Sequence, residues 1–454
     1  MLVAGLLATG CSPNGLFGQG ARPPDTTSAT PQGSSTVAAS RDESADRARR
    51  GDHPPRTPDI KPEVIPDQAA NAYRAIEEAT SRIRGLKPTR DVELRFMSQA
   101  ELRQYFLDSF NREYTPDERA RDQKLLTMLG LLRPDQDLAT LMLNVLSEQV
   151  IGFYDDDTRR MYLIGDVVQP TPSAKVTFSH EFTHALQDEF FGLKALEPRE
   201  SQDDDRSAAV QALVEGDATL VMTLYARDEL SLDERRRYAL SQSGGAGTLE
   251  DAPLVLREEL LFPYSEGLRF VQTLYRQGGF PTVDTAFRNP PQSTEQIIHP
   301  NKYLSQEAPE AVVLPDLASP LGGNWRHTAS NTLGELDVRI LVEQYTDRQT
   351  AERAAAGWAG DRYALLEDAA GRSAVAIKTT WDSPEDASKF FKAYSQAIRN
   401  RLGSQARQLA SEPARLALAG TAVAAEAELQ NREVLLVIAP EEVLSTVAQS
   451  LAGR

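Results

Sequence analysis

The sequence of 454 residues contains one cysteine, Cys11, and five histidines. A single cysteine cannot close an intramolecular disulfide, so disulfide-stapled folds are excluded. Positively charged side chains are in deficit, with 49 Lys and Arg against 66 Asp and Glu, which gives a net charge of −17. Nucleic-acid binding needs clustered positive charge, and we therefore expect no nucleic-acid partner. Beyond the N-terminal segment no apolar run approaches the roughly 18 residues that a membrane span requires, so no further span is expected.

The most informative stretch is the run from His180 to His184, HEFTH, which has the pattern HExxH. On a helix, residues four apart share one face, so both imidazoles can bind one Zn²⁺ while Glu181 between them reaches an attacking water. Two nitrogen ligands, a Lewis acid and a general base are parts of a hydrolytic metal site. The alternative interpretation is a helix whose two histidines are merely packed or solvated.

A catalytic zinc site needs a third protein ligand, and Glu215 is the candidate. It follows His184 by 215 − 184 = 31 residues and lies in a predicted helix over 208–225 with apolar side chains at helical spacing. Gly216 would let this helix approach the metal-binding helix closely. Asp217, about 200° around the helix from Glu215, is expected to face solvent. The alternative for Glu215 is an ordinary exposed helix glutamate, in which case His299 or Asp188 is the next candidate for the third ligand.

These motifs together resemble those of a known group of enzymes. HEFTHALQDEF followed by LVEGDA is similar to the HExxH…E zinc metallopeptidases of the gluzincin type. The similarity is greatest to a family of largely uncharacterised bacterial envelope lipoproteins regarded as metalloproteases. Segments 150–155, 264–267 and 293–300 also resemble that family, so that the likeness extends over about 87–304. The resemblance implies a zincin-like domain with a mixed-sheet lobe and a helical lobe.

The resemblance also implies roles for individual residues. His180, His184 and Glu215 would hold one Zn²⁺ per chain, and Glu181 would be the general base in the hydrolysis of a polypeptide substrate. His299 would be the donor to the oxyanion, a role that Tyr303 is close enough in sequence to share or replace, and Tyr264 begins a helix that could pack against the metal-binding helices. The alternative for His299 is a histidine that caps or packs a loop.

One position departs from the thermolysin-like pattern. Thr219 stands where those enzymes carry an aspartate, which leaves that supporting carboxylate without a counterpart. Asp188 lies at helical spacing on the face of the two histidines, and we expect it to hydrogen-bond to one of the ligands.

The N-terminus resembles that of a bacterial lipoprotein. Residues 1–11 form a short apolar segment that ends in Ala8-Thr9-Gly10-Cys11, similar to a lipobox whose cysteine receives the lipid. Ala8 replaces the usual leucine, and no basic residue precedes the apolar run. Residues 12–62, rich in Pro, Ser and Thr, cannot bury enough apolar area to fold and are expected to form a flexible tether. We therefore expect an exported protein of the bacterial cell envelope, anchored to the membrane by lipid.

The remaining sequence predicts an α+β protein in two domains, a zincin-like metallopeptidase domain over 63–307 and a smaller α+β domain over 308–454. Asp155 to Asp157 lack the spacing of a calcium loop and are interpreted as a hairpin turn. Trp325, Trp358 and Trp381 are expected in cores or between domains. Helices are predicted at 69–84, 99–111, 117–132, 138–146, 208–225, 264–277, 384–401 and 441–451, strands at 91–97, 149–154, 160–164, 332–345, 362–367, 373–381 and 433–438, and largely irregular structure at 281–304.

Two further functional classes stay open at this stage. One is a binding or scaffold lipoprotein that keeps the zincin fold without catalysis, and the other is a non-enzymatic domain stabilised by zinc. The presence of Glu181 favours the enzyme, because a structural zinc site needs no base and usually has four protein ligands. The sequence leaves the oligomeric state and the cleavage specificity open.

Overall fold

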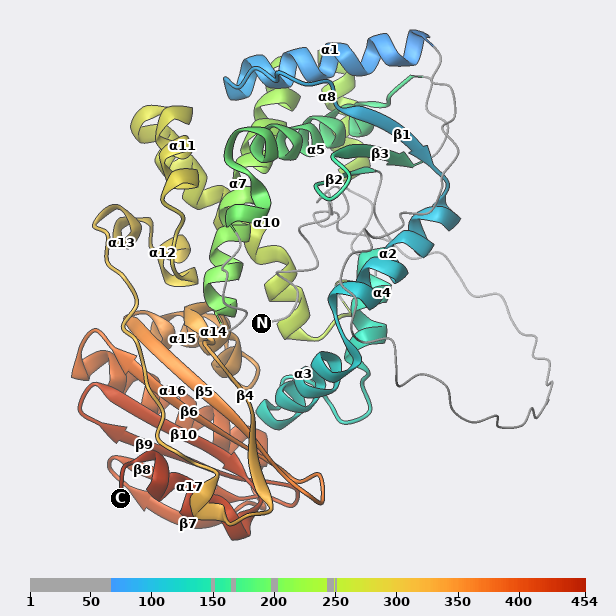
Figure 1. The fold of residues 1–454 in the computed structure, drawn as a ribbon. Coiled ribbons are helices and arrows are strands. Elements are labelled where there is room, and N and C mark those ends of the chain that lie inside the picture. Colours follow the sequence, from blue (N-terminus) through green and yellow to red (C-terminus); the bar gives the residue numbers. More distant parts are fainter. Residues whose placement is uncertain (1–66, 148–151, 165–168, 197–202, 243–248, 250) are drawn as a thin grey trace, which may run out of the picture.

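A computed structural model of the chain describes residues 67–147, 152–164, 169–196, 203–242, 249 and 251–454. The predicted signal segment with Cys11, and the tether at 12–62, lie outside these residues. The described chain is a mixed α+β protein, as predicted. Figure 1 shows a mainly helical N-terminal part with a small sheet, and a C-terminal part built on a larger sheet.

A small mixed sheet lies in the N-terminal part. It has the order β1-β3-β2, with β1 (Glu93–Met97) parallel and β2 (Gly152–Asp155) antiparallel to the central β3 (Arg160–Ile164). The turn between β2 and β3 is confirmed, because the Asp155 carboxylate accepts hydrogen bonds from the N–H groups of Asp157 and Thr158. Helices α1 (Asp67–Arg84), α2 (Gln99–Glu113), α3 (Pro116–Leu129) and α4 (Leu138–Ser147) confirm the predicted helices of this region.

The helical lobe is built around two long helices, α7 (Asp204–Asp228) and α10 (Leu254–Gly278). Helix α10 starts ten residues before the predicted 264 and contains Pro263 in its interior, although proline usually marks a helix boundary. The region 281–304, predicted as mostly irregular, is instead helical. Its short helices, together with the remaining ones of this lobe, are α5 (Pro172–Phe191), α6 (Leu193–Leu196), α8 (Leu232–Gln242), α11 (Phe280–Arg288), α12 (Thr294–Ile298) and α13 (Pro300–Leu304).

The predicted strand at 332–345 is wrong, since the segment forms helix α14 (Gly334–Glu343). Residues 335–340 alternate polar and apolar side chains, which is the pattern of a half-buried strand, yet every residue from Gly334 to Val342 is buried in the helix. No side chain next to the N-terminus of the helix caps it. Instead, the carboxylate of Asp361, far along the chain, accepts hydrogen bonds from the N–H groups of Leu333 and Gly334 at 2.9 Å each. The signal for this helix is therefore tertiary.

The C-terminal part is a seven-stranded antiparallel sheet in the order β4-β5-β6-β10-β9-β8-β7. The predicted strands at 362–367, 373–381 and 433–438 lie within β5 (Trp358–Asp368), β6 (Ser373–Trp381) and β10 (Glu433–Ala439). Strands β8 and β9 escaped prediction because they are rich in alanine, which has low strand propensity. The missed strands are β4 (Trp325–Asn331), β7 (Arg407–Glu412), β8 (Arg415–Ala419) and β9 (Ala424–Gln430).

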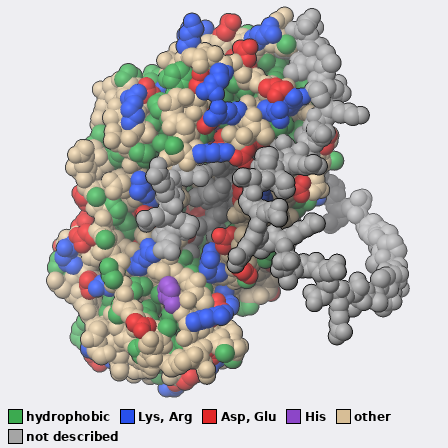
Figure 2. All heavy atoms as spheres, in the orientation of Figure 1, with side chains coloured by type: hydrophobic (Ala, Val, Ile, Leu, Met, Phe, Trp, Pro, Cys, Tyr) green, Lys and Arg blue, Asp and Glu red, His purple; other side chains and the backbone are tan. Residues whose placement is uncertain are grey.

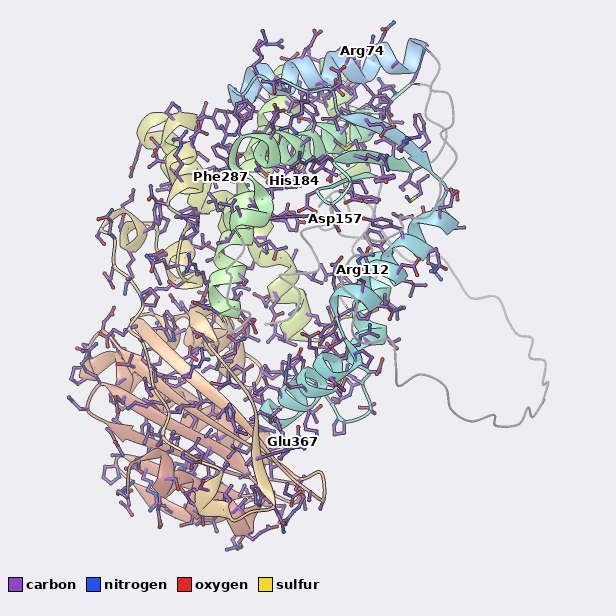
Figure 3. All side chains as sticks on the ribbon, viewed as in Figure 1. Arg74, Arg112, Asp157, His184, Phe287 and Glu367 are labelled. Carbon is purple, nitrogen blue, oxygen red and sulfur yellow. The ribbon has the colours of Figure 1, made fainter. Side chains whose placement is uncertain are left out.

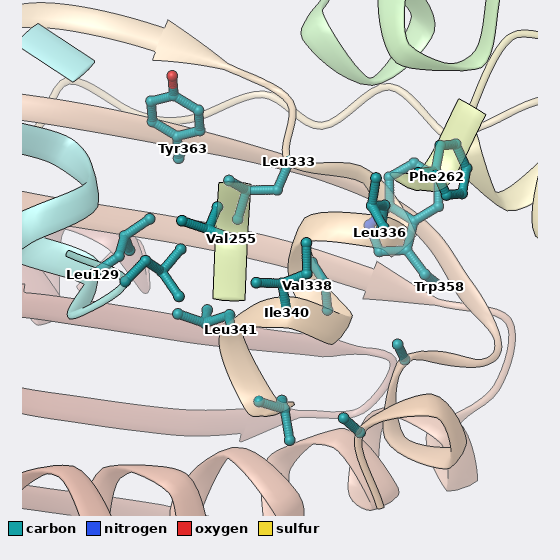
Figure 4. Packing of buried hydrophobic residues seen from close by; sticks show 14 of the residues in the cluster. Leu129, Val255, Phe262, Leu333, Leu336, Val338, Ile340, Leu341, Trp358 and Tyr363 are labelled. Atoms are coloured by element: carbon teal, nitrogen blue, oxygen red, sulfur yellow. The ribbon is translucent and has the colours of Figure 1, made fainter. Parts of the chain in front are cut away.

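Helices cover both faces of this sheet. Helices α14, α15 (Arg348–Ala355) and α16 (Pro384–Leu402) share a core with one face, and α17 (Glu441–Leu451) with a 3₁₀ turn at Ser319–Leu321 covers the other. The first core continues into the N-terminal part, where Leu129 of α3 and Val255 of α10 pack near Tyr363 of β5 (Figure 4). The two parts therefore share one hydrophobic core. Burial of Trp325, Trp358 and Trp381 is confirmed, with exposed fractions of 8%, 0% and 0%.

The surface agrees with the composition. On the face shown in Figure 2, acidic and basic side chains are interspersed, and Lys and Arg form no continuous patch. None of the described helices combines the length and hydropathy needed to cross a bilayer.

Candidate metal centre

Helix α5 carries the HExxH motif, and local signals define both of its ends. Thr171 caps it by accepting a hydrogen bond from the Ala174 N–H, Pro172 occupies the first turn, and Gly192 ends it in the left-handed conformation. The residues from Val176 to Gln187 are all buried. A helix this buried is uncommon for a polar motif and requires a partner for every polar side chain. Figure 3 shows His184 on α5, between the β2–β3 turn and helix α11.

Helix α7 brings Glu215 to α5. The adjacent Gly216 does allow α7 to approach another helix closely. That helix is α10, whereas the sequence predicted the contact with the metal-binding helix α5. A Cβ atom at Gly216 would lie 2.3 Å from the carbonyl oxygen of Gly267, and one at Gly267 would lie 2.2 Å from that of Ala212. Both glycines are therefore required for the contact between α7 and α10.

The structure brings the three predicted ligands together. Nε2 of His180 lies 3.1 Å from Nε2 of His184 and 3.1 Å from Oε2 of Glu215, and the third separation, from His184 to Glu215, is 3.5 Å. Ligand atoms arranged tetrahedrally around zinc at roughly 2.0–2.1 Å lie about 3.3 Å apart. The triangle of donor atoms thus has the size that a zinc site requires, and all three residues are buried.

Gln187 determines which nitrogen of His184 is free to bind a metal. The Gln187 side-chain N–H₂ faces two groups that can only accept, the carbonyl oxygen of Val214 at 3.0 Å and Asp217 Oδ2 at 2.9 Å. Its Oε1 therefore faces His184 Nδ1, 2.8 Å away, and that nitrogen must carry the proton. In the neutral imidazole the lone pair is then on Nε2, which points into the triangle. The donor set fits a cation.

The charges in the triangle balance each other in the absence of a metal. Burial by itself would lower the pKa of His184, but the Glu215 carboxylate raises it to about 9. Burial likewise acts to raise the pKa of Glu215, and the histidines, chiefly His184, instead lower it to about 2. A metal ion would therefore compete with a proton on His184 for this site.

Glu181 lies beside the triangle and is fully buried. Its Oε2 accepts a hydrogen bond from the backbone N–H of Tyr154 in the edge strand β2, at 3.2 Å. Its Oε1 has no hydrogen-bond partner among the described residues. Burial raises the pKa of Glu181, which makes it a stronger base than an exposed glutamate.

Two predictions about neighbouring acids are wrong. Asp217 does not face solvent: it is completely buried and forms an ion pair with the equally buried Arg84 at the end of α1, with Nε to Oδ2 at 2.9 Å. Asp188 does not hydrogen-bond to a ligand; its carboxylate accepts from the Tyr154 hydroxyl at 3.0 Å and from the backbone of Leu193. The adjacent Gln187 forms the hydrogen bond to His184 instead.

The structure does not bring His299 to the triangle. His299 lies between α12 and α13, and its Nε2 is 2.9 Å from Oε1 of Glu335 in α14. The Tyr303 hydroxyl donates to the carbonyl oxygen of Asn289 at 2.9 Å. Tyr264 of α10 is closer, since its ring centroid lies 6.3 Å from that of His180. Of His299, Tyr303 and Tyr264, Tyr264 is thus the residue whose ring lies next to a predicted ligand.

A second group of acidic residues lies outside the proposed metal site and surrounds a lysine. Carboxylates of Glu295, Glu307 and Asp382 converge near one another, but the ammonium group of Lys302 lies among them, within 2.6–2.7 Å of each. The ammonium group of Lys302 thus already occupies the position between these carboxylates that a cation would take. It links the helical lobe to the C-terminal sheet.

Two comparisons with known proteins gave a match. Residues 322–448 match a family described as a domain of unknown function (DUF8575). A crystal structure from Chloroflexus aurantiacus, described as a "putative hydrolase with a novel fold", is 19% identical with a TM-score of 0.35, over 53% of this chain and 89% of that chain. No curated protein matches the chain. The family match lies entirely C-terminal to His180, His184 and Glu215, so the site has to be interpreted from its own geometry.

Proposed function

We propose that this protein is a zinc-dependent hydrolase of peptide bonds with a zincin-like catalytic site. The observation that carries the proposal is the triangle of His180 Nε2, His184 Nε2 and Glu215 Oε2, with separations of 3.1–3.5 Å, beside the buried Glu181. The three residues would hold the zinc ion. When bound, zinc would polarise the scissile carbonyl group and make a water molecule more acidic.

Glu181 supplies the proton transfers in this proposal. The backbone N–H of Tyr154 holds one carboxylate oxygen, and the other oxygen is available to accept a proton from the attacking water. The same carboxyl group then donates the proton to the leaving amine. Burial raises the pKa of this carboxyl group, which favours its taking a proton from the attacking water.

The edge strand β2 supports a peptide as the substrate. It forms one edge of the described three-stranded sheet and reaches Glu181 through Tyr154, although all four of its residues are buried. An edge strand offers backbone N–H and carbonyl groups to an extended peptide, which would then lie alongside the base. Tyr264 takes the place of His299 as the proposed donor to the oxyanion.

Glu181→Gln tests the proposal. The substitution removes the base but keeps the size and the acceptor for the Tyr154 N–H, so the protein should still fold and bind zinc. We expect hydrolysis of a peptide library to fall by about 10²–10⁴-fold in zinc-loaded protein. Near-normal turnover by this variant would exclude the mechanism. A wild-type protein that binds zinc but cleaves no peptide would favour a scaffold or a structural zinc domain.

We further propose that the protein is an exported lipoprotein of the bacterial envelope, held to the membrane through Cys11. The support is the lipobox-like sequence before the chain's single cysteine. Cys11→Ser should move the protein from the membrane fraction to the soluble fraction. A variant that stays with the membrane after a high-salt wash would contradict the anchor.

A further inference from the structure

A chain of buried polar contacts runs from the proposed metal site to the end of helix α1. His184 Nδ1 contacts Gln187, the Gln187 amide contacts Asp217, and Asp217 is paired with Arg84. Gln187, Asp217 and Arg84 are each fully buried and come from α5, α7 and α1. Burying an arginine and an aspartate is costly unless their geometry is fixed. The three side chains therefore need an explanation beyond packing.

We propose that Gln187, oriented by the Arg84–Asp217 ion pair, is a positioning residue that fixes the tautomer and ring plane of His184 for zinc. This inference rests on the proposed function and assigns to Gln187, Asp217 and Arg84 a role in metal affinity. Ligating histidines generally donate their second N–H to an acceptor, which orients the ring. Here the acceptor is the side-chain oxygen of Gln187, and its orientation is determined by the groups that accept hydrogen bonds from the Gln187 nitrogen.

The ion pair determines that orientation because it leaves only acceptors facing the Gln187 nitrogen. Asp217 Oδ2 receives Nε–H of Arg84 at 2.9 Å, so the guanidinium holds the carboxylate in place. Arg84 is held in turn by Asp284 of α11 at 2.7 Å and by the ring of Phe280, whose centroid is 4.6 Å from its Cζ. If the amide turned over, its oxygen would face the Val214 carbonyl and the Asp217 carboxylate. The arrangement thus excludes the wrong tautomer of His184.

Gln187→Leu, which removes the acceptor at similar size, tests the proposal. We expect zinc affinity, measured by competition with a chelator of known affinity, to fall by about 10–100-fold. In zinc-loaded protein labelled with ¹⁵N-histidine, the Nδ1–H resonance of His184 should lose its downfield shift and exchange faster with water. Gln211→Leu is the matched control: Gln211 is a buried glutamine of α7 whose Nε2 has no partner among the described residues. It should leave zinc affinity and the His184 resonance unchanged.

Moving the buried negative charge from residue 217 to residue 187 distinguishes a positioning role of Gln187 from a role in packing alone. Gln187→Glu puts a carboxylate against Asp217 and should lower zinc affinity at least as much as the leucine. Adding Asp217→Asn moves the buried negative charge instead of adding one, and its amide can donate to the introduced carboxylate. We expect the double variant to regain at least tenfold of the affinity lost by Gln187→Glu. If the single and double variants bind zinc equally, the ion pair does not orient residue 187.

The outcomes distinguish this inference from the proposed function. Unchanged zinc affinity and an unchanged His184 resonance in Gln187→Leu would overturn the positioning role and leave the catalytic proposal standing. Full turnover by Glu181→Gln with the expected loss of affinity in Gln187→Leu would overturn the catalytic proposal alone. A wild-type protein that binds no zinc would remove both.

Discussion

At the scale of single residues, the chemistry of the site depends on which atoms of His184 and Glu215 carry a proton. His184 shares its triangle with a carboxylate, and Gln187 holds its second nitrogen in the protonated form. The proposed ligands are thus arranged so that a metal ion would have to displace a proton. The motif HExxH predicts the ligands but contains no information on this competition.

Zinc binding should therefore release a proton. At pH 7.5 the pH lies below the pKa of about 9 for His184, so the imidazole is charged without metal, and far above the pKa of about 2 for Glu215, which is already ionised. Zinc has to displace the His184 proton. We expect about one proton from His184 per zinc at pH 7.5, and close to none at pH 10.5. Titration calorimetry in buffers of different ionisation enthalpy measures this number, and a release that does not change between the two pH values would contradict the assignment.

At the scale of elements, sequence prediction succeeded where the signal is local. Helices α2 and α3 begin with capping boxes at Ser98 and Thr115, and the β2–β3 turn carries its own acceptor in Asp155. It failed where the signal comes from elsewhere in the fold. Helix α14 is buried all round and its N-terminus is capped by Asp361 of β5, while its residues 335–340 alternate like those of a strand, so its own sequence does not predict a helix.

The candidate site divides in the same way. His180, Glu181 and His184 follow from spacing on one helix, and Glu215 from an apolar helix that carries an unexplained charge. The prediction that Asp217 faces solvent rests on its angle around the helix. That angle gives the direction of the side chain but not which part of the protein lies there. Its partner Arg84 is 133 residues away along the chain, and no sequence pattern connects the two.

The contact between α7 and α10 gives a prediction at this scale. Gly→Ala inside a helix normally adds about 1 kcal/mol of stability. Gly216→Ala should instead lower the free energy of unfolding by about 1–3 kcal/mol, because the new methyl group would collide with the Gly267 backbone. Zinc affinity should fall with it, since Glu215 is the adjacent residue. Thr223→Ala, on the exposed side of α7, is the control and should change stability by less than about 0.5 kcal/mol in urea unfolding. A more stable Gly216→Ala variant would show that the helices can separate freely.

At the scale of the whole molecule, the two parts are joined by more than a linker. One hydrophobic core includes residues of α3, α10, α14 and β5. Polar contacts cross the same boundary: Arg401 of α16 donates to the carbonyl oxygens of Met128 and Leu129, and Lys124 of α3 pairs with Glu367 of β5. Unfolding of one part would expose the core of the other.

The two parts should therefore unfold together. All three tryptophans, Trp325, Trp358 and Trp381, lie in the C-terminal part, whereas the proposed zinc ligands lie in the N-terminal part. Tryptophan fluorescence and the release of zinc to a coloured chelator then report on different parts of the molecule. In a urea titration of zinc-loaded protein we expect the two midpoints to coincide. Zinc release well before the fluorescence change would mean that the parts are independent units.

The central claim is that His180, His184 and Glu215 hold one zinc ion, and X-ray diffraction at the zinc absorption edge tests it most directly. Crystals of the protein loaded with one equivalent of zinc should show one strong anomalous peak. The account predicts that this peak lies roughly 2.0–2.1 Å from Nε2 of both histidines and from a carboxylate oxygen of Glu215. A peak elsewhere, for example among Glu295, Glu307 and Asp382, or no peak within the His180–His184–Glu215 triangle, would contradict it.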